Sequence, residues 1–165
     1  MKVAHVVTRV VVGGLFIGHG TQKLAGWFGG SGLEASAAGF ESMGLRPGKR
    51  NAIAAGAAEA GGGALLALGA ATPLAGAALI GTMITAIRTV HWKNGPWSAN
   101  GGYEYNLVLI AAVALLVEAG PGCLSLDHAR RSEKKGVGWA LFAVAAGIAG
   151  SLAATTLAAR EAPQG

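Results

Sequence analysis

Residues 51–71 read NAIAAGAAEAGGGALLALGAA, a long apolar stretch in which Glu59 is the only charged residue. A helix rises about 1.5 Å per residue, so this stretch is long enough to cross a bilayer core of about 30 Å. Thr72 and Pro73 follow directly, and proline is well tolerated in the first turn of a helix. We therefore predict a membrane-spanning helix here, joined by a very short turn to an antiparallel second helix.

The composition of the whole chain indicates an integral membrane protein and excludes an ordinary soluble domain. Of its 165 residues, 52% are hydrophobic and 13% are charged, and the mean hydropathy is +0.48. Soluble domains carry about 25% charged residues, and half that proportion cannot cover the surface of a soluble protein of this size. The 28 glycines fall mainly in apolar runs, as in closely packed membrane helices. Gly14 and Gly18 form a GxxxG pattern, which is weak evidence for such a contact.

Apolar segments recur along the chain and predict an all-α bundle of transmembrane helices. Arg9 lies about two turns into the first segment, and its long side chain is expected to snorkel toward lipid head groups. Residues 33–43 are mildly amphipathic and predict a surface helix. We expect a multi-pass protein of the cell inner (plasma) membrane. The predicted spans are residues 3–24, 51–71, 73–90, 103–119 and 137–159.

The charges and the single cysteine limit the partners and cofactors. The net charge is +5 and the basic residues gather in loops, which favours contact with anionic lipid head groups over nucleic acid binding. Cys123 alone excludes an internal disulfide, a CxxC pair and a c-type haem site. The sequence has no zinc-ligand cluster, Walker loop or Rossmann fingerprint, so we predict no bound metal or haem. The basic loop residues are Arg46, Lys49, Arg50, Arg130, Arg131, Lys134 and Lys135.

Glu59 is the most informative residue, because its position in the second segment places it near the middle of the bilayer. An isolated carboxylate there would be very unfavourable, so Glu59 must be protonated, paired with a cation or hydrogen-bonded. Two interpretations remain open. Either Glu59 ties helices together, or it holds a proton, a quinone-like head group or a small ligand.

His19, Gln22 and Lys23 lie three and four residues apart, so they share one helix face. This face forms either a polar cap at the membrane interface or a surface that meets Glu59 or Glu104 inside the bundle. A histidine in that interior position could titrate near neutral pH and pass protons.

Arg88 and His91 share a face at the end of the third segment. They form either an interfacial pair or a site for an anionic partner, for which Glu104 is the candidate. Glu104 follows Tyr103 at the start of the fourth segment, and tyrosine is typical of membrane interfaces. Asp127 lies near a segment end and is expected to be solvated.

Four stretches of the chain carry a family resemblance. They read GHGTQKLAGWFGG at 18–30, Glu59 followed by glycines and by LALG at 66–69, GGYEY at 101–105, and GPG at 120–122 with SLD at 125–127. In this order they resemble the DoxX family of small membrane proteins. The resemblance implies a four-helix membrane core at 1–128, followed by a charged loop at 129–136, an additional fifth transmembrane helix at 137–159 and a tail at 160–165.

The resemblance also implies a link to membrane oxidoreductase systems. Some DoxX proteins are small subunits of thiosulfate:quinone oxidoreductase, and others are associated with thiol and oxidative stress defence. We therefore expect a subunit, catalytic or not, of a quinone or thiol/sulfur redox system, with soluble redox proteins as partners and quinone as the suggested cofactor. The match is carried by His19, Lys23, Glu59, Gly102, Tyr103 and Glu104. The candidates for a polar pocket inside the bundle are His19, Lys23, Glu59, Arg88, His91, Tyr103 and Glu104.

Two other functions stay open. A non-enzymatic anchor for soluble redox partners would use the charged loop at 127–135 as its docking surface. A small-solute carrier is disfavoured, because few polar residues line any segment and the sequence shows no convincing inverted repeat.

Overall fold

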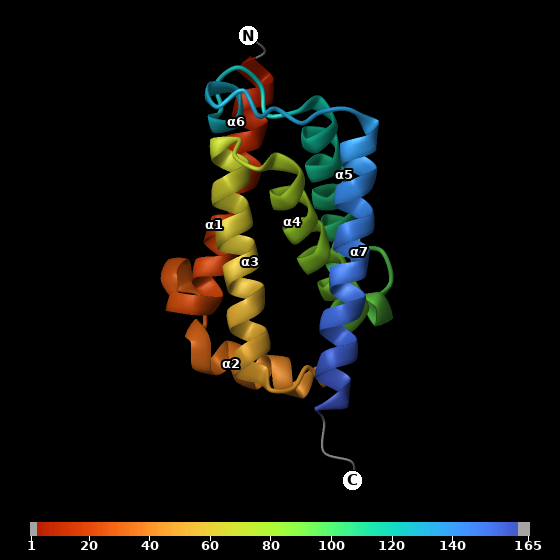
Figure 1. Cartoon of the computed structure of the whole chain (residues 1–165). Coiled ribbons are helices and arrows are strands. Elements are labelled where there is room, and N and C mark those ends of the chain that lie inside the picture. Colours follow the sequence, from red (N-terminus) through yellow and green to blue (C-terminus); the bar gives the residue numbers. More distant parts are fainter. Residues whose placement is uncertain (1–2, 162–165) are drawn as a thin grey trace.

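The computed structural model describes residues 3–161, and the regular secondary structure of that range is helical throughout (Figure 1). A π-helical turn η2 (Ile87–His91) and a 3-10 turn η3 (Trp92–Asn94) continue the fourth helix, and further 3-10 turns are η1 (Trp27–Gly29) and η4 (Ser98–Asn100). The last part of the predicted tail, residues 162–165, lies outside the described residues. The α-helices are α1 (Val3–Ala25), α2 (Gly32–Ser42), α3 (Gly48–Leu68), α4 (Thr72–Ala86), α5 (Glu104–Ala119), α6 (Leu126–Ala129) and α7 (Val137–Arg160).

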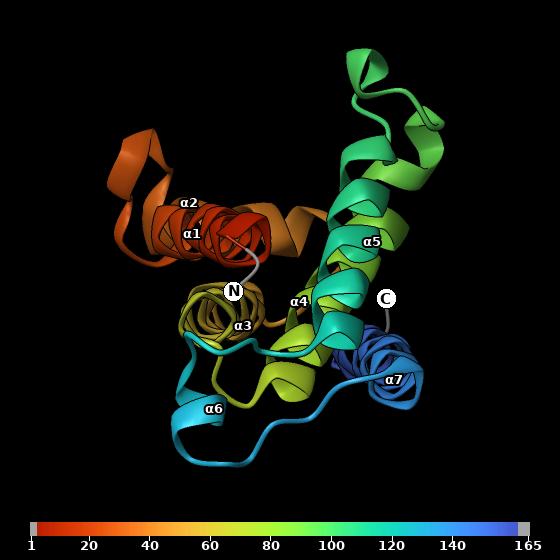
Figure 2. The same cartoon turned by 90° about the horizontal axis from the view of Figure 1, so that it is seen from above.

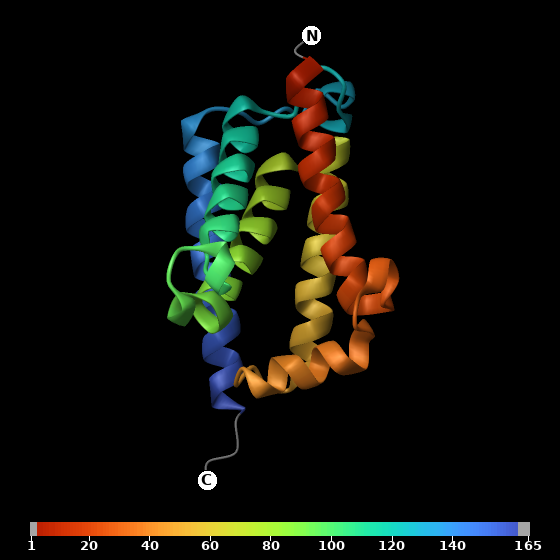
Figure 3. The same cartoon turned by 180° about the vertical axis from the view of Figure 1, so that it is seen from behind.

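Four helical stretches of the described chain are long and apolar enough to cross a membrane. They are α1, α3, the continuous stretch Thr72–Asn94 and α7. The shorter α5, with 16 residues, runs beside α4 and α7 (Figures 1 and 3). The start of α1 and the end of α7 therefore lie at opposite ends of the bundle. The predicted all-α transmembrane bundle, with an apolar helix near the C-terminus, is confirmed, and the predicted segments match the helices to within a few residues.

The antiparallel helices α1 and α3 form one half of the bundle, and glycines make their contact (Figure 2). A Cβ atom on Gly13 would lie 2.5 Å from the carbonyl oxygen of Gly63, and a Cβ atom on Gly20 would lie 2.5 Å from the carbonyl oxygen of Gly56. Only glycine fits these positions, so the two backbones touch, as small residues allow in membrane helices. The GxxxG pattern that begins at Gly14 faces open space instead.

The helices α4, α5 and α7 form the other half, with α4 packed against both of its partners. Leu79 and Ile80 of α4 and Val117 of α5 are fully buried, and they belong to one apolar cluster with Ala143 of α7. Dense side-chain packing of this kind stabilises helix association within lipid, where apolar burial alone gives little. Gly81 and Gly147 bring the backbones of α4 and α7 close together.

Arg9 joins α1 to the loop between α5 and α7, which lies at the upper end of the bundle in Figure 1. Only 3% of its surface is exposed. Its guanidinium donates hydrogen bonds to the carbonyl oxygens of Ala67 (3.2 Å), Leu124 (2.5 Å) and Pro121. The expected snorkelling to lipid head groups is therefore wrong, because backbone carbonyls supply the polar contacts that the charge requires.

Asp127, expected to be solvated, is also buried, with 6% of its surface exposed. Its carboxylate accepts hydrogen bonds from the backbone N–H groups of Ala71 (2.9 Å) and Thr72 (3.2 Å) and from the Thr72 hydroxyl (3.1 Å). These are the first amides of α4, which have no partner within the helix. The loop from α5 to α7 is thereby fixed onto the turn between α3 and α4.

The helix α2 lies across the bundle axis at the lower end, below α3 (Figures 1 and 3). The prediction of a helix over 33–43 agrees with the observed α2. Two exposed ion pairs lie at this end, Lys49 with Glu34 at 2.7 Å and Arg50 with Glu161 at 2.6 Å. Arg50 belongs to α3 and Glu161 follows α7, so the second pair connects the two halves of the bundle.

Candidate functional site

A partly open cavity of about 930 Å³ lies between the two halves of the bundle, lined by the C-terminal parts of α1 and α4 and the N-terminal parts of α3 and α5. Alanine and glycine form much of its wall, including Ala58 of α3, Gly81 of α4 and Gly150 of α7. Their small side chains leave space between helices that meet closely elsewhere. A volume of this order lies within the range of small-molecule sites, about 300–1,000 Å³.

Glu59 lines this cavity and forms an ion pair with Lys23 across the α1–α3 contact. The Glu59 Oε2 and Lys23 Nζ atoms lie 2.5 Å apart, and only 4% of the Glu59 surface is exposed. Lys23 Nζ also lies 3.4 Å from the carbonyl oxygen of His19, one turn earlier. The glycine contacts of α1 and α3 bring these charges together, so the face that carries Lys23 turns inward. The ammonium supplies the partner that the Glu59 carboxylate requires at this depth.

His91 reaches the same cavity from the end of α4. It is the last residue of the π-helical turn η2 (Ile87–His91), and such turns are rare and often occur at functional sites. Its Nδ1 lies 2.7 Å from the carbonyl oxygen of Gly101. A carbonyl oxygen can only accept a hydrogen bond, so Nδ1 carries the proton. Nε2 is then an acceptor in the neutral ring and a donor in the protonated ring.

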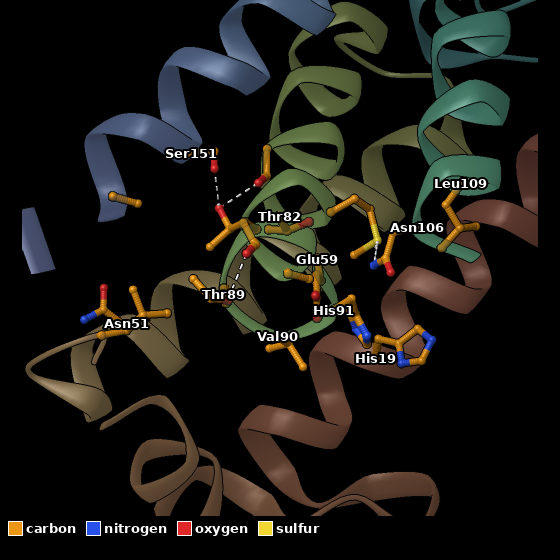
Figure 4. Close-up of a pocket in the computed structure, with 18 of the residues that line it drawn as sticks. His19, Asn51, Glu59, Thr82, Thr89, Val90, His91, Asn106, Leu109 and Ser151 are labelled. Atoms are coloured by element: carbon orange, nitrogen blue, oxygen red, sulfur yellow. Dashed lines mark hydrogen bonds between the residues drawn. The ribbon is translucent and has the colours of Figure 1, made fainter. Parts of the chain in front are cut away.

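Figure 4 shows the Glu59 carboxylate and the rings of His91 and His19 directed into one region of the cavity. These groups come from α3, from the end of α4 and from α1. The site therefore combines an acid–base pair, two imidazoles and a largely apolar wall. Such a set of groups can donate and accept hydrogen bonds to an uncharged polar head group and can exchange protons with it.

Sequence reasoning missed Asn106, which lines the cavity from α5. Its side chain is 6% exposed, and its Nδ2 lies 3.4 Å from the sulfur of Met83. A single amide in a mainly apolar helix is the signal that could have drawn attention to it, because polar groups in membrane helices usually face a partner or a cavity.

Arg88, Tyr103 and Glu104 do not line the cavity. Glu104 accepts a hydrogen bond from the backbone N–H of Ser98 at 2.8 Å, and Tyr103 stacks on Trp92 with the ring centres 5.5 Å apart. Arg88 turns toward α7, where it bonds hydroxyl groups. The suggested pairing of Arg88 with Glu104 is therefore wrong. Of the seven predicted pocket residues, the cavity brings together His19, Lys23, Glu59 and His91.

The sequence of the chain matches a family model described as DoxX over residues 4–92. The chain belongs to the DoxX family. The matched range of this DoxX protein runs from α1 to Trp92, so it includes the Lys23–Glu59 pair and both cavity histidines. The helices α5 and α7, which complete the cavity wall, lie beyond it. Neither a curated protein nor a solved structure matches the chain.

Proposed function

We propose that this DoxX protein is a small subunit of an oxidoreductase system of the plasma (inner) membrane, and that its cavity receives a quinone head group. One observation carries the proposal: the Lys23–Glu59 ion pair and His91 border the same cavity inside an apolar helix bundle. Ionisable groups at such depth usually serve a ligand or a proton path. A quinone is itself lipid-soluble, so it can reach a cavity between membrane helices.

The chemistry follows from the hydrogen-bonding capacity of these groups. Reduction of a quinone to a quinol adds two electrons and two protons, one proton to each oxygen. The electrons would come from a soluble redox partner protein. The Lys23 ammonium and a protonated His91 can donate hydrogen bonds to quinone oxygens, and neutral His91 can accept one from a quinol hydroxyl. Glu59 holds the Lys23 ammonium in place through their ion pair.

The first test measures binding of a short-chain benzoquinone to the purified protein in detergent. The quenching of tryptophan fluorescence reports the binding. We expect Glu59→Gln and His91→Gln each to weaken binding by about tenfold, which corresponds to about 1.4 kcal/mol. The control is Glu34→Gln, which alters an acid of an exposed ion pair and should bind as the parent does. Unchanged affinity in correctly folded Glu59→Gln and His91→Gln proteins would count against the proposal.

The second test is quinone reduction in isolated membranes that contain the complete redox system. Glu59→Gln should reduce the rate of quinol formation, while the amount of protein in the membrane stays the same. An unchanged rate at an unchanged protein level would contradict a role of the cavity in the reaction.

A second candidate function, a membrane anchor for soluble redox proteins, is favoured by a different observation. The basic residues of the loop before α7 are all exposed, while Asp127 fixes the loop to the bundle. A fixed, positively charged surface suits an acidic protein partner. Neutralising these residues should abolish recovery of partners from detergent extracts, and the absence of any partner would defeat this alternative. The residues are Arg130, Arg131, Lys134 and Lys135.

A further inference from the structure

Arg88 lies at the seam between α4 and α7, beside the cavity wall but not part of it. Its Nη1 donates hydrogen bonds to the hydroxyl oxygens of Thr155 (3.1 Å) and Ser151 (3.3 Å) on α7. Thr85 joins this group, with its hydroxyl 3.0 Å from that of Ser151. A cation is thus held in place by neutral hydroxyl groups.

No acidic residue is available to Arg88 from the two helices that form the seam. The stretch Thr72–Asn94 and the helix α7 contain neither aspartate nor glutamate. The next acid after α7 is Glu161, whose carboxylate is paired with Arg50. Lys49 at the same end also has an acidic partner, Glu34. Within residues 3–161, the charge of Arg88 is not balanced by any ion pair.

The Nε and Nη2 groups of Arg88 remain available as hydrogen-bond donors, and the guanidinium that carries them is already held in position. A guanidinium has five N–H groups, and both hydrogen bonds of Arg88 come from Nη1, so Nε and Nη2 have no protein acceptor among the described residues. The Thr155 hydroxyl directs its own proton to the carbonyl oxygen of Ser151, 2.9 Å away, which leaves its lone pairs toward Arg88. Because the side chain is already fixed, little rotamer freedom is left to lose when an anion binds.

The seam lies at the depth of lipid head groups. Arg88 precedes Trp92 by one helical turn, and 69% of the Trp92 surface is exposed. Exposed tryptophans are typical of the membrane–water interface. Thr155 lies near the end of α7, which finishes at Arg160. A long arginine side chain at this level is within reach of lipid phosphates.

The geometry points to a binding site for the phosphate of an anionic phospholipid, formed by Arg88 and braced by Ser151 and Thr155. The paired N–H groups of a guanidinium match two oxygens of a phosphate, which makes arginine the preferred residue for such contacts. Free inorganic phosphate offers the same oxygens. The acyl chains of a lipid would lie along the apolar outer surface beside the seam. Ser151 also lines the cavity proposed for the quinone, whereas Arg88 and Thr155 do not, so variants of Arg88 and Thr155 test the lipid site separately.

The test compares lipid retention by purified protein in native mass spectrometry after exchange into detergent with phosphatidylglycerol or phosphatidylcholine. The parent protein should retain phosphatidylglycerol at least about fivefold more than phosphatidylcholine. Arg88→Gln should abolish this preference, and Arg88→Lys should weaken it, because lysine lacks the planar fork. Thr155→Val keeps the charge but removes a brace, so it should reduce retention. Arg160→Gln, which removes an exposed charge at the same end, should retain the preference.

Two outcomes would overturn the lipid site. Equal preference in the parent, Arg88→Gln and Arg160→Gln proteins would show that Arg88 recognises no lipid. Stabilisation by inorganic phosphate that depends on Arg88, without any preference for phosphatidylglycerol, would assign the site to a free anion. Benzoquinone binding measured on the same Arg88→Gln protein should be unchanged, so the lipid site and the cavity are tested separately.

Discussion

Arg9 and Asp127 bind the two helix ends that meet at the turn between α3 and α4. The Arg9 guanidinium bonds the carbonyl oxygen of Ala67 in the last turn of α3, and the Asp127 carboxylate accepts the first amides of α4. A helix carries partial negative charge at its C-terminal end and partial positive charge at its N-terminal end. Each buried charge therefore faces the end of opposite sign, and each satisfies backbone groups that the helices leave without partners.

Removing the Asp127 carboxylate should destabilise the protein. Asp127→Ala leaves two amides and the Thr72 hydroxyl without an acceptor, at a cost of about 1–3 kcal/mol. Thermal unfolding in detergent, followed by circular dichroism, should show a lower midpoint. Glu133→Ala is the matched control, because Glu133 lies in the same loop and forms an exposed pair with His128. Equal midpoints for the two variants would contradict the role given to Asp127.

A methyl group in the α1–α3 contact should also be destabilising. Gly63→Ala would place its Cβ 2.5 Å from the carbonyl oxygen of Gly13, and overpacking of this kind costs about 1–3 kcal/mol. Gly14→Ala, with nothing within 4 Å of the added atom, should leave the stability unchanged or raise it by up to about 1 kcal/mol through helix propensity. Thermal unfolding in detergent distinguishes the Gly63→Ala and Gly14→Ala proteins. Similar unfolding midpoints for the two variants would argue against a backbone contact at Gly63.

The Lys23–Glu59 pair predicts a specific pattern of coupling. Lys23→Met leaves a buried carboxylate without its cation and should cost about 3 kcal/mol or more. Adding Glu59→Gln to Lys23→Met removes the uncompensated charge, so the double variant should unfold at a higher temperature than Lys23→Met alone. A double-mutant cycle of unfolding midpoints measures this coupling. Additive effects would mean that the two side chains do not interact.

The pair between Arg50 and Glu161 should behave differently, although it also joins α3 to the end of α7. Both partners are exposed, at 51% and 43% of their side-chain surfaces, and exposed pairs contribute about 0–1 kcal/mol. Arg50→Gln should shift the unfolding midpoint little, and the shift should disappear in high salt. A large, salt-independent loss of stability would show that this contact fixes the lower end.

The spans and the need of Glu59 for a partner were predictable from the sequence, because both follow from local composition. An apolar run of sufficient length has few alternatives to a membrane helix, and a lone carboxylate within it requires compensation. The inward orientation of the face that carries Lys23 was one of two alternatives. The glycine contacts between α1 and α3 determine which face of α1 points inward. Those contacts depend on the relative rotation of the two helices, which the sequence does not give.

The contacts of Arg9, Asp127 and His91 were beyond sequence reasoning for a common reason. Their partners are mainly backbone groups, and a backbone carbonyl or amide leaves no signature in the sequence. Asp127 bonds residues 55 and 56 positions earlier, and Arg9 bonds a carbonyl 58 positions later. The π-helical turn at His91 likewise has no residue pattern that predicts it. Arg9 was expected to snorkel because it lies about two turns into its segment, and Asp127 was expected to be solvated because it lies near a segment end.

The cavity is lined by residues of α2 and by the parts of the long helices next to α2, away from the contacts of Arg9 and Asp127. A quinone bound there, as proposed, would therefore lie on the α2 side of the bundle and not beside the contacts of Arg9 and Asp127.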